Sequence, residues 1–386
     1  MFRKKSMISL VLMLCILVGT AMPVRAEVAI SSPSVILVES STGEVIYEVN
    51  ATERRCPASI TKIMTLLLTF EAIEEGRAAL TDEVIVSEYA SSMGGSQVYL
   101  AQGEVQTLDT MIKCIAVSSG NDASVAVAEH LAGSEGAFVE QMNEKAAKLG
   151  MVDTHFEDCC GLTNSDNHYT SAKDVSIMSR ELTTKYPAIF DYTMIWMDSI
   201  THKTPQGTSQ FTLSSTNKLL KQYQWTTGLK TGSTDKAKYC FAATASKDGI
   251  GLIAVVMGAP DYKTRFGDAQ TLLTYGFGIC DVYVDENVEG LAPLPLKRGV
   301  VEELPIAYEG EFRYLDVEGN NLTAVEKVVE LPEEVQAPVE AGQEIGRAKY
   351  LLKGVEIGSV PIVAKESVEE AGYLDYLKKL FGEFLL

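Results

Sequence analysis

The chain has 386 residues, 46% of them hydrophobic, and its formal net charge is −19 at pH 7. This length exceeds what one hydrophobic core usually supports, so we expect two folded domains with short appendages. The hydrophobic content is ordinary for a folded protein and argues against long disordered regions. The negative charge argues against nucleic acid as a partner, because such binding depends on neutralising phosphates with basic side chains.

Residues 1–26 have the composition of a secretory signal. Three basic residues at positions 3–5 precede an apolar run from Ile8 to Val18, and Val24-Arg25-Ala26 is typical of a cleavage site. The run is short for a membrane span, although an uncleaved anchor is the alternative. No later segment approaches the roughly 18 continuous apolar residues that a spanning helix needs. We therefore expect an exported protein that begins near residue 27.

Six cysteines remain after this segment. An even number in an exported protein permits disulfides, but the pairing cannot be deduced, so free buried thiols and one or two bridges are both open. No Cys-x-x-Cys pair occurs, and the histidines at positions 130, 155 and 202 lack metal-ligand spacing. We expect no metal and no cofactor. The cysteines are Cys56, Cys114, Cys159, Cys160, Cys240 and Cys280.

The first half of the chain predicts one hairpin followed by helices. Residues 35–50 alternate in polarity and turn at Thr42-Gly43, which indicates a β-hairpin. An apolar helix is expected from Pro57, a residue suited to a first helical turn. Residues 108–147 show helical periodicity with a break at 118–121, and a further helix is expected around 171–182.

The character of the chain changes at Gly228. Residues 238–246 and 250–259 are strand-like and flank Lys247-Asp248-Gly249, a strong hairpin signal, and a helix is expected near 263–276. Strands therefore lie at both ends of residues 27–278 and helices lie between them. This order predicts a sheet built from the two ends with a helical subdomain inserted.

The last hundred residues differ from the rest. Residues 279–364 combine short β-branched stretches, prolines and turn pairs, which predicts a small β-rich domain. Residues 365–386 have apolar side chains at helical spacing and predict an amphipathic helix. This helix could pack on the protein itself or lie on a membrane surface.

Three short motifs combine residue types that serve serine acyl transfer. Ser-x-x-Lys occurs three times, Ser-x-Asn three times and Lys-Thr-Gly once. Only Ser59/Lys62 opens an apolar helix, where side chains three residues apart face the same way. Burial there would lower the pKa of the lysine, and a neutral amine can take the serine proton. Taken alone, the pair also fits a helix-start serine beside a lysine that reaches solvent.

By themselves, the other two motifs are equally weak evidence for a catalytic role. Ser119-Gly120-Asn121 lies in a turn between predicted helices, where its serine would also suit a helix cap. Lys230-Thr231-Gly232 precedes two predicted strands, and its glycine would let a backbone or ligand approach closely, although the motif alone would also suit a strand end. Together the three follow the order of the signature of class A β-lactamases and penicillin-binding proteins, with 60 residues between the first and second serines.

The segments around these motifs closely resemble the low-molecular-weight penicillin-binding D-alanyl-D-alanine carboxypeptidases. The resemblance covers about residues 31–276 and continues more weakly to the end of the chain. It implies the penicillin-recognising serine transpeptidase/β-lactamase-like fold, an α/β fold with an antiparallel sheet, an inserted helical subdomain and a small C-terminal β domain. The matching segments are PASITKIMT, SSGNDASVAVAEHLAG, DTHFEDCCGL, STNKLL and GLKTGSTDKAKYCFAATASKDG.

The resemblance also implies a reaction, the removal of the terminal D-Ala from peptidoglycan pentapeptide stems through an acyl-enzyme that β-lactams trap covalently. Ser59 would be the nucleophile and Lys62 its base. Ser119 and Asn121 would relay a proton and hold the substrate backbone. A second nearby cation, Lys230, would help to keep Lys62 neutral.

The Lys-Thr-Gly motif would bind the substrate. Lys230 and Thr231, with Gly232 in the same motif, would steer the terminal carboxylate. The backbone N–H groups of Ser59 and Ser233 would form the oxyanion hole, where donors aimed at the developing charge usually supply a large catalytic effect.

Other residues in the same region have weaker claims to a role. Ser165-Asp166-Asn167 spells the β-lactamase element but lies 106 residues past Ser59 in a polar loop, so we expect no direct role. His168 matches a loop histidine common in the family, which either shapes the site or is only hydrogen-bonded within the loop. Glu157 is the nearby candidate for the deacylating glutamate of a β-lactamase, but its surroundings resemble the carboxypeptidases.

Two rival functions follow from the same residues. The same fold could act as a D,D-endopeptidase or a β-lactamase, or the chain could be a catalytically silent penicillin-binding scaffold. The intact motifs argue against the scaffold. In this family a terminal amphipathic helix lays the protein on the outer face of the cytoplasmic membrane, where we expect this chain to act.

Overall fold

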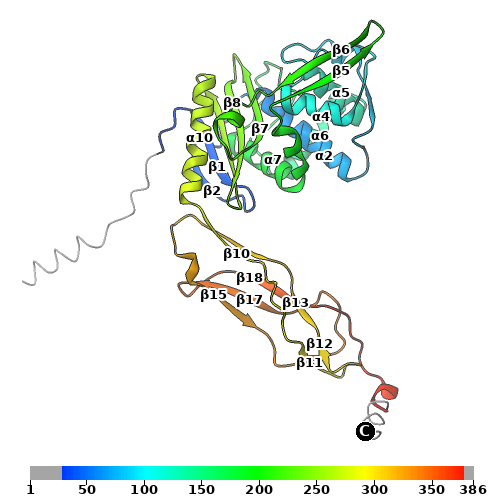
Figure 1. The fold of residues 1–386 in the computed structure, drawn as a ribbon, viewed down its shortest axis with the longest axis vertical. Helices are drawn as coiled ribbons and strands as arrows, with labels where there is room; N and C mark the ends of the chain where they lie inside the picture. The colour runs from blue at the N-terminus through cyan, green and yellow to red at the C-terminus, as the bar shows by residue number, and fades with distance from the viewer. Residues whose placement is uncertain (1–27, 378–386) are drawn as a thin grey trace, which may run out of the picture.

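The computed structural model describes residues 28–377, in two parts arranged end to end (Figure 1). The larger part extends to α10 (Tyr262–Ile279), and the strands that follow form a separate β unit. The predicted signal sequence and residues 378–386 of the predicted tail helix lie outside the described residues. Within the described part, no helix is both long and apolar enough to cross a membrane.

A five-stranded antiparallel sheet forms the centre of the larger part. Its order, β2-β1-β9-β8-β7, pairs the first hairpin with the last three strands. This pairing confirms the prediction of a sheet made from two ends with helices inserted between them. The strands are β1 (Ser34–Glu39), β2 (Val45–Val49), β7 (Thr226–Thr234), β8 (Lys238–Lys247) and β9 (Ile250–Ala259).

The predicted turn between β8 and β9 is present. Asp248 and Gly249 both have positive φ angles, 51° and 78°, as a tight two-residue hairpin requires. The Lys230-Thr231-Gly232 motif lies within the edge strand β7, near its end, as the sequence suggested for a strand end, and it precedes β8 and β9.

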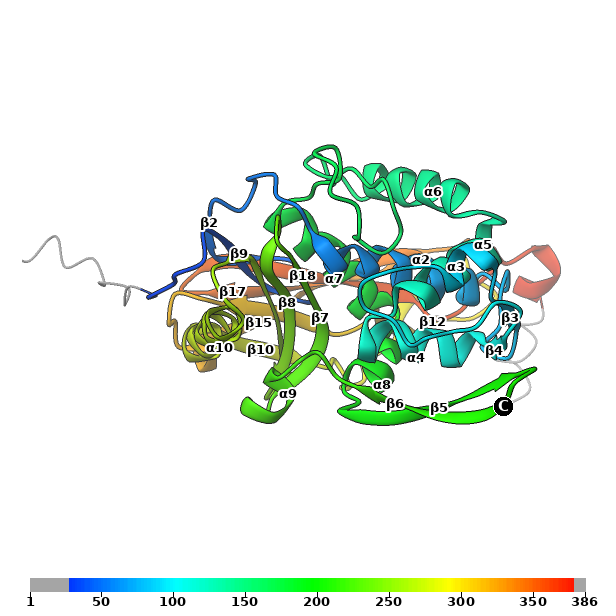
Figure 2. The same cartoon turned by 90° about the horizontal axis from the view of Figure 1, so that it is seen from above.

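The sheet is covered on both faces. Alternate residues of β9 point to opposite sides, so Leu252 and Val256 pack in one cluster with α10, and Ile253 and Val255 pack in another with the helical subdomain. Figure 2 shows α10 on one side of the sheet and the helices of the subdomain on the other. This two-sided burial explains why β9 reads as a continuous apolar run.

The inserted helical subdomain follows the predicted pattern, including the break between α4 and α5. The β5–β6 hairpin was missed, because its strands are polar and largely exposed and carry little hydrophobic signal. The elements are η1 (Ala58–Thr61), α2 (Lys62–Glu74), β3 (Glu83–Ile85), α3 (Glu88–Ser91), β4 (Val105–Thr107), α4 (Leu108–Ser118), α5 (Asn121–Ala132), α6 (Glu135–Lys148), α7 (Ala172–Lys185), η2 (Pro187–Ile189), α8 (Phe190–Thr193), β5 (Met197–Thr204), β6 (Gly207–Ser214) and α9 (Leu219–Gln222).

The β unit has its own small cores. Val368, beyond the last strand, is 3% exposed and exchanges backbone hydrogen bonds with Val339, so residues after Ala364 still pack on this unit. Its elements are β10 (Asp281–Asp285), β11 (Leu294–Lys297), β12 (Glu303–Leu304), β13 (Ile306–Tyr308), β14 (Phe312–Asp316), η3 (Leu322–Ala324), β15 (Val325–Glu330), β16 (Val335–Gln336), β17 (Glu344–Leu352) and β18 (Val355–Ala364).

All six cysteines of residues 28–377 are buried free thiols. Of the two alternatives left open by the sequence, the structure has the free thiols. Burial raises the pKa of the Cys240 thiol to about 11, which keeps it protonated and unreactive at neutral pH.

Candidate active site

Ser59 lies in η1, immediately before the buried helix α2. The expected α-helix therefore begins later than Pro57, and the serine lies on a 3₁₀ turn, in which residues three apart are almost eclipsed. Ser59 is partly exposed, whereas Lys62 is completely buried. The turn thus presents a hydroxyl that a solute can reach beside an amine that water cannot.

Three oxygen atoms surround the Lys62 amine. Its Nζ lies 3.1 Å from Ser59 Oγ, 2.6 Å from Asn121 Oδ1 and 2.7 Å from the carbonyl oxygen of Cys160. A charged ammonium can donate to all three, but a neutral amine has only two hydrogens and one lone pair. Because the amide and carbonyl oxygens can only accept, the lone pair of the neutral amine is directed at the Ser59 hydroxyl.

The break between α4 and α5 holds the second motif. Ser119 ends α4 in a left-handed conformation, with a φ of 61°, and Asn121 begins α5. Ser119 Oγ accepts a hydrogen bond from Lys230 Nζ at 2.8 Å. The Asn121 amide donates to the carbonyl of Gly94 at 2.7 Å, which fixes its oxygen toward Lys62. The turn therefore brings two buried polar side chains to the two lysines, with Asn121 bonded to Lys62 and Ser119 bonded to Lys230.

The edge strand β7 supplies the third motif. Lys230 and Thr231 are buried, and Thr231 Oγ1 donates to Thr216 Oγ1 at 2.7 Å. Gly232 lies directly against η1, because a Cβ added there would be 2.8 Å from the carbonyl oxygen of Pro57 and 3.0 Å from the backbone nitrogen of Ser59. Only glycine allows β7 to approach the 3₁₀ turn at Ser59 this closely. The next residue along the strand, Ser233, is exposed.

Burial governs the protonation of both lysines. It lowers the pKa of Lys62, because low dielectric penalises the charged form. It also lowers the pKa of Lys230 well below the usual value, and the positive charges of Lys62 and Arg265 lower it further. The site therefore favours a neutral amine, as the sequence predicted for Lys62.

The loop that closes behind Ser59 was not predicted from the sequence. The Asp158 carboxylate accepts backbone hydrogen bonds from Cys160, Leu162 and Thr163, and also from Gly161. Although burial acts to raise it, the pKa of Asp158 is lowered overall by His168 and by these N–H groups. This turn aims the Cys160 carbonyl at Lys62. The segment HFEDCCGL was visible in the sequence, but nothing in it signalled a contact 98 residues away.

Gly161 packs directly against the 3₁₀ turn that carries Ser59. Its φ is 77°, and a Cβ there would lie 1.8 Å from the carbonyl oxygen of Ala58. Ala58 itself has a positive φ of 47°, an uncommon conformation for a residue with a side chain. The backbone before Ser59 is therefore held in place by the loop packed on it.

His168 is buried and supports the same turn. The backbone N–H of Glu157 donates to His168 Nδ1 at 3.0 Å, so the neutral ring carries its hydrogen on Nε2. That nitrogen lies 2.8 Å from Thr61 Oγ1, which in turn donates to the Ala58 carbonyl at 2.8 Å. Burial lowers the pKa of His168, in keeping with a neutral ring.

The loop motif Ser165-Asp166-Asn167 contacts its own loop, His155 and Lys236. Lys236 Nζ lies 2.6 Å from Asp166 Oδ1 and 2.9 Å from the Ser165 carbonyl oxygen. Ser165 Oγ accepts from the backbone of Asn167 at 3.1 Å. None of these atoms contacts Ser59, Lys62 or Ser119, so the motif is a loop tether, as its position in the sequence suggested.

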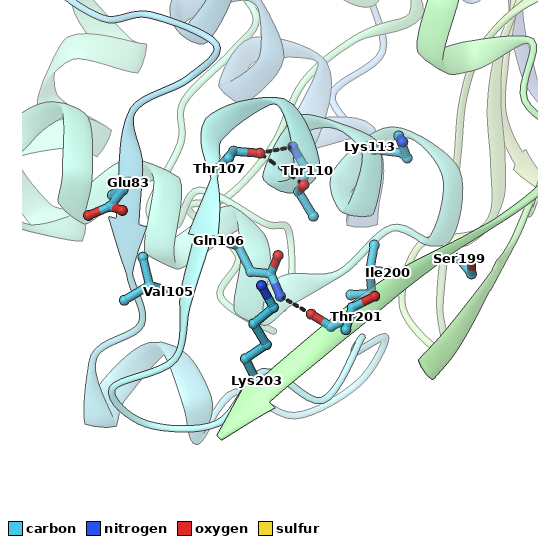
Figure 3. A pocket seen from close by; sticks show the side chains of 10 residues that line it. All are labelled: Glu83, Val105, Gln106, Thr107, Thr110, Lys113, Ser199, Ile200, Thr201 and Lys203. Carbon is cyan, nitrogen blue, oxygen red and sulfur yellow. Dashed lines mark hydrogen bonds between the residues drawn. The ribbon is translucent and has the colours of Figure 1, made fainter. Parts of the chain in front are cut away.

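A second pocket, of about 410 Å³, lies on the helical subdomain and contains none of the predicted site residues. Gln106 donates to the Thr201 carbonyl at 2.9 Å, and the hydroxyls of Thr107 and Thr110 are 2.9 Å apart (Figure 3). These four groups bond to one another in pairs, and the pocket is separate from the residues around Ser59.

An antiparallel sheet whose edge strand packs on a serine–lysine turn is the architecture of the serine enzymes that react with penicillin. Within that class, the chain belongs to the D-alanyl-D-alanine carboxypeptidase family, whose model matches residues 20–261. Residues 280–370 match the family described as penicillin-binding protein 5, C-terminal domain. The resemblance predicted from the motifs and the predicted fold class are thereby confirmed.

Individual relatives agree with this assignment. The chain is 38% identical to D-alanyl-D-alanine carboxypeptidase DacF of Bacillus subtilis over 93% of this chain and 91% of the relative. It is 30% identical to D-alanyl-D-alanine carboxypeptidase DacA of Escherichia coli over 91% and 88% of the two chains. The crystal structure of penicillin binding protein 5 from Haemophilus influenzae superposes with a TM-score of 0.72 at 27% identity, covering 91% of this chain and all of that one.

Proposed function

We propose that Ser59 is the nucleophile of a D-alanyl-D-alanine carboxypeptidase and that Lys62 is its general base. The observation that carries this proposal is the position of the buried Lys62 amine between two fixed acceptor oxygens and the Ser59 hydroxyl, 3.1 Å away. In the neutral state the amine accepts the serine proton as Ser59 attacks the carbonyl of the penultimate D-Ala. The terminal D-Ala leaves, and water hydrolyses the acyl-enzyme.

The remaining motif residues bind and protonate the substrate. Ser119, hydrogen-bonded to Lys230, passes a proton to the leaving amine, and Asn121 holds the substrate backbone. Lys230 and Thr231 bind the terminal carboxylate, and Gly232 lets β7 lie close enough for this. A strained β-lactam ring would acylate the same serine.

The carbonyl oxygen of the scissile bond would lie in an oxyanion hole. Its donors are the backbone N–H groups of Ser59 and Ser233. The close packing of Gly232 on the Ser59 backbone supports this role, because it brings the two segments side by side. Preorganised donors of this kind stabilise the charge that develops on the oxygen in the transition state.

Replacement of the nucleophile tests this proposal. We expect Ser59→Ala to abolish covalent labelling by a fluorescent penicillin, while the free energy of unfolding changes by less than about 1 kcal/mol. Ser165→Ala is the matched control. It removes a serine hydroxyl from the loop motif Ser165-Asp166-Asn167, and it should leave labelling intact. Labelling of folded Ser59→Ala at the wild-type rate would refute the assignment.

The leaving group separates the carboxypeptidase from its rivals on the same fold. Incubation with a synthetic pentapeptide, a crosslinked peptide dimer and nitrocefin, followed by mass spectrometry or absorbance, compares the three reactions directly. We expect release of one D-Ala from the pentapeptide to be the fastest reaction. Faster cleavage of the dimer or of nitrocefin would indicate an endopeptidase or a β-lactamase instead.

We further propose an exported protein with a signal sequence at residues 1–26, a catalytic domain over 27–278 and a β domain from 279. The chain after Gly372 would associate with the outer face of the cytoplasmic membrane. Tyr373 is 78% exposed and Leu374 69%, so the described start of the tail does not pack on the β domain. Apolar side chains that face solvent suit an interfacial helix.

Removal of the tail tests the membrane proposal. We place the truncation after Gly372, because a chain ending at Ala364 would lose buried Val368. The full chain should sediment with phospholipid vesicles and the truncated chain should not, while both hydrolyse a soluble pentapeptide equally. Binding should depend little on salt, because the tail is not basic. A truncated chain that still sediments would show that the tail is not the anchor.

A further inference from the structure

A pocket of about 420 Å³ adjoins the candidate active site at the end of β7. It carries one residue of each charge, Asp235 on the turn between β7 and β8 and Lys238 at the start of β8. We infer that this pocket receives the side chain of the stem residue that precedes the two D-alanines, and that it favours a side chain ending in both an ammonium and a carboxylate group. The pocket is lined by Ser233, Thr234, Asp235, Lys238, Tyr239 and Pro260.

The position of the pocket follows from the direction of the substrate, and this step rests on the proposed function. The leaving D-Ala has its carboxylate at Thr231, and the scissile carbonyl lies at Ser233, further along β7. An extended peptide on the edge of this strand therefore continues past Ser233 toward Asp235. At about 3.3 Å per residue, the stem residue before the two D-alanines lies beside the pocket.

The two charges in the pocket are free to bind a ligand. Asp235 and Lys238 are exposed, and neither forms an ion pair or a side-chain hydrogen bond within residues 28–377. The adjacent Lys236 does not neutralise Asp235, because its ammonium is bound to Asp166 at 2.6 Å and to two loop carbonyls. The pocket thus offers one unpaired acceptor group and one unpaired donor group.

The backbone conformation at Lys238 indicates that the turn itself does not require a lysine at this position. Its φ is 57°, in the left-handed region, where residues with a Cβ are less stable by about 1 kcal/mol and glycine is favoured. A turn without a second function would gain stability from glycine at this position. The lysine therefore adds a positive charge to the pocket at some cost in stability.

The charges select for a particular stem chemistry. A side chain that ends in an amino acid group, as in diaminopimelic acid, can give its ammonium to Asp235 and its carboxylate to Lys238. A lysine side chain can satisfy only Asp235. A diaminopimelate side chain whose distal carboxyl is amidated resembles lysine in this respect, because it has lost the negative charge.

Pentapeptides that differ only at this residue test the inference. For the wild-type chain we expect kcat/KM to be about fivefold higher with diaminopimelate than with lysine or with amidated diaminopimelate, since a partly exposed ion pair contributes up to about 1 kcal/mol. This preference should shrink in 1 M salt. Lys238→Gly should abolish the preference by lowering kcat/KM for diaminopimelate alone, and Asp235→Asn should lower it for all three peptides.

The controls separate this inference from the proposed function. Lys238→Gly suits the positive φ, so a loss of preference cannot be attributed to misfolding, and Lys148→Gln removes an exposed lysine outside the pocket. Penicillin labelling should be unchanged in all three variants, because benzylpenicillin has no ionic side chain for the pocket. Equal hydrolysis of the three pentapeptides by a wild-type chain that is still labelled would overturn this inference alone. A wild-type chain that is neither labelled nor active would overturn the proposed function.

Discussion

Lys62→Met should slow acylation by penicillin and by pentapeptide about 10³-fold, the usual range for loss of a general base. Methionine keeps the length and apolar stem of the side chain, so α2 should remain packed. What is lost is the lone pair 3.1 Å from Ser59 Oγ, without which the hydroxyl has no nearby proton acceptor. Stopped-flow measurement of acylation by a chromogenic β-lactam gives the rate constant directly.

A pH profile tests whether Lys62 is the base. Because burial lowers the pKa of this amine, wild-type acylation should rise with pH as Lys62 loses its proton and fall as pH drops through the lowered pKa. This limb should be absent in Lys62→Met. Lys218→Met is the control, since Lys218 belongs to another Ser-x-x-Lys pair and lies exposed. A Lys62→Met chain that acylates at the wild-type rate with the same pH limb would exclude Lys62 as the base.

Gly161→Ala should lower the free energy of unfolding by about 3 kcal/mol, from steric overlap together with the positive φ. The added methyl group would lie 1.8 Å from the carbonyl oxygen of Ala58, so one of the two backbones must move. Movement of Ala58 shifts Ser59 relative to Lys62, and acylation should slow at least about tenfold. Unfolding can be followed by the fluorescence of Trp196 and Trp225, which both lie in the catalytic part.

Gly150→Ala provides the matched control for this substitution. Gly150 has a similar φ of 73°, but an added Cβ there meets no atom within 4 Å. Its replacement should cost only the conformational penalty of about 1 kcal/mol and leave acylation unchanged. If the two substitutions destabilise the chain equally, the contact between Gly161 and Ala58 does not hold the turn that carries Ser59.

Much of the fold was determined by local patterns in the sequence. Strand-like apolar runs on both sides of Asp248-Gly249 specified a hairpin, and helical periodicity interrupted at Ser119 specified two helices with a turn between them. These signals are local, because an apolar face and a turn residue act within a few neighbours. The polar β5–β6 hairpin lacked an apolar face and therefore could not be predicted in this way.

For the same reason, contacts between neighbouring residues of the site could be predicted, whereas contacts between distant residues could not. Ser59 and Lys62 are three residues apart, so the helical turn alone places them together. The chain holds three such pairs, however, and the apolar helix that follows only Ser59, together with the family resemblance, distinguished this pair from the others. The contact of Lys230 with Ser119 joins residues 111 positions apart, and no local pattern encodes it.

By itself, the sequence determined the chemical groups and which of them are neighbours along a turn or strand. Only the tertiary structure decided that the Cys160 carbonyl and Asn121 occupy two positions around the Lys62 amine and leave the third for Ser59. It also decided that Gly161 and Gly232 must be glycine, because each lies against a backbone segment about 100 residues or more distant in the chain. Such contacts depend on how separate elements pack, and packing depends on the shape of the whole core.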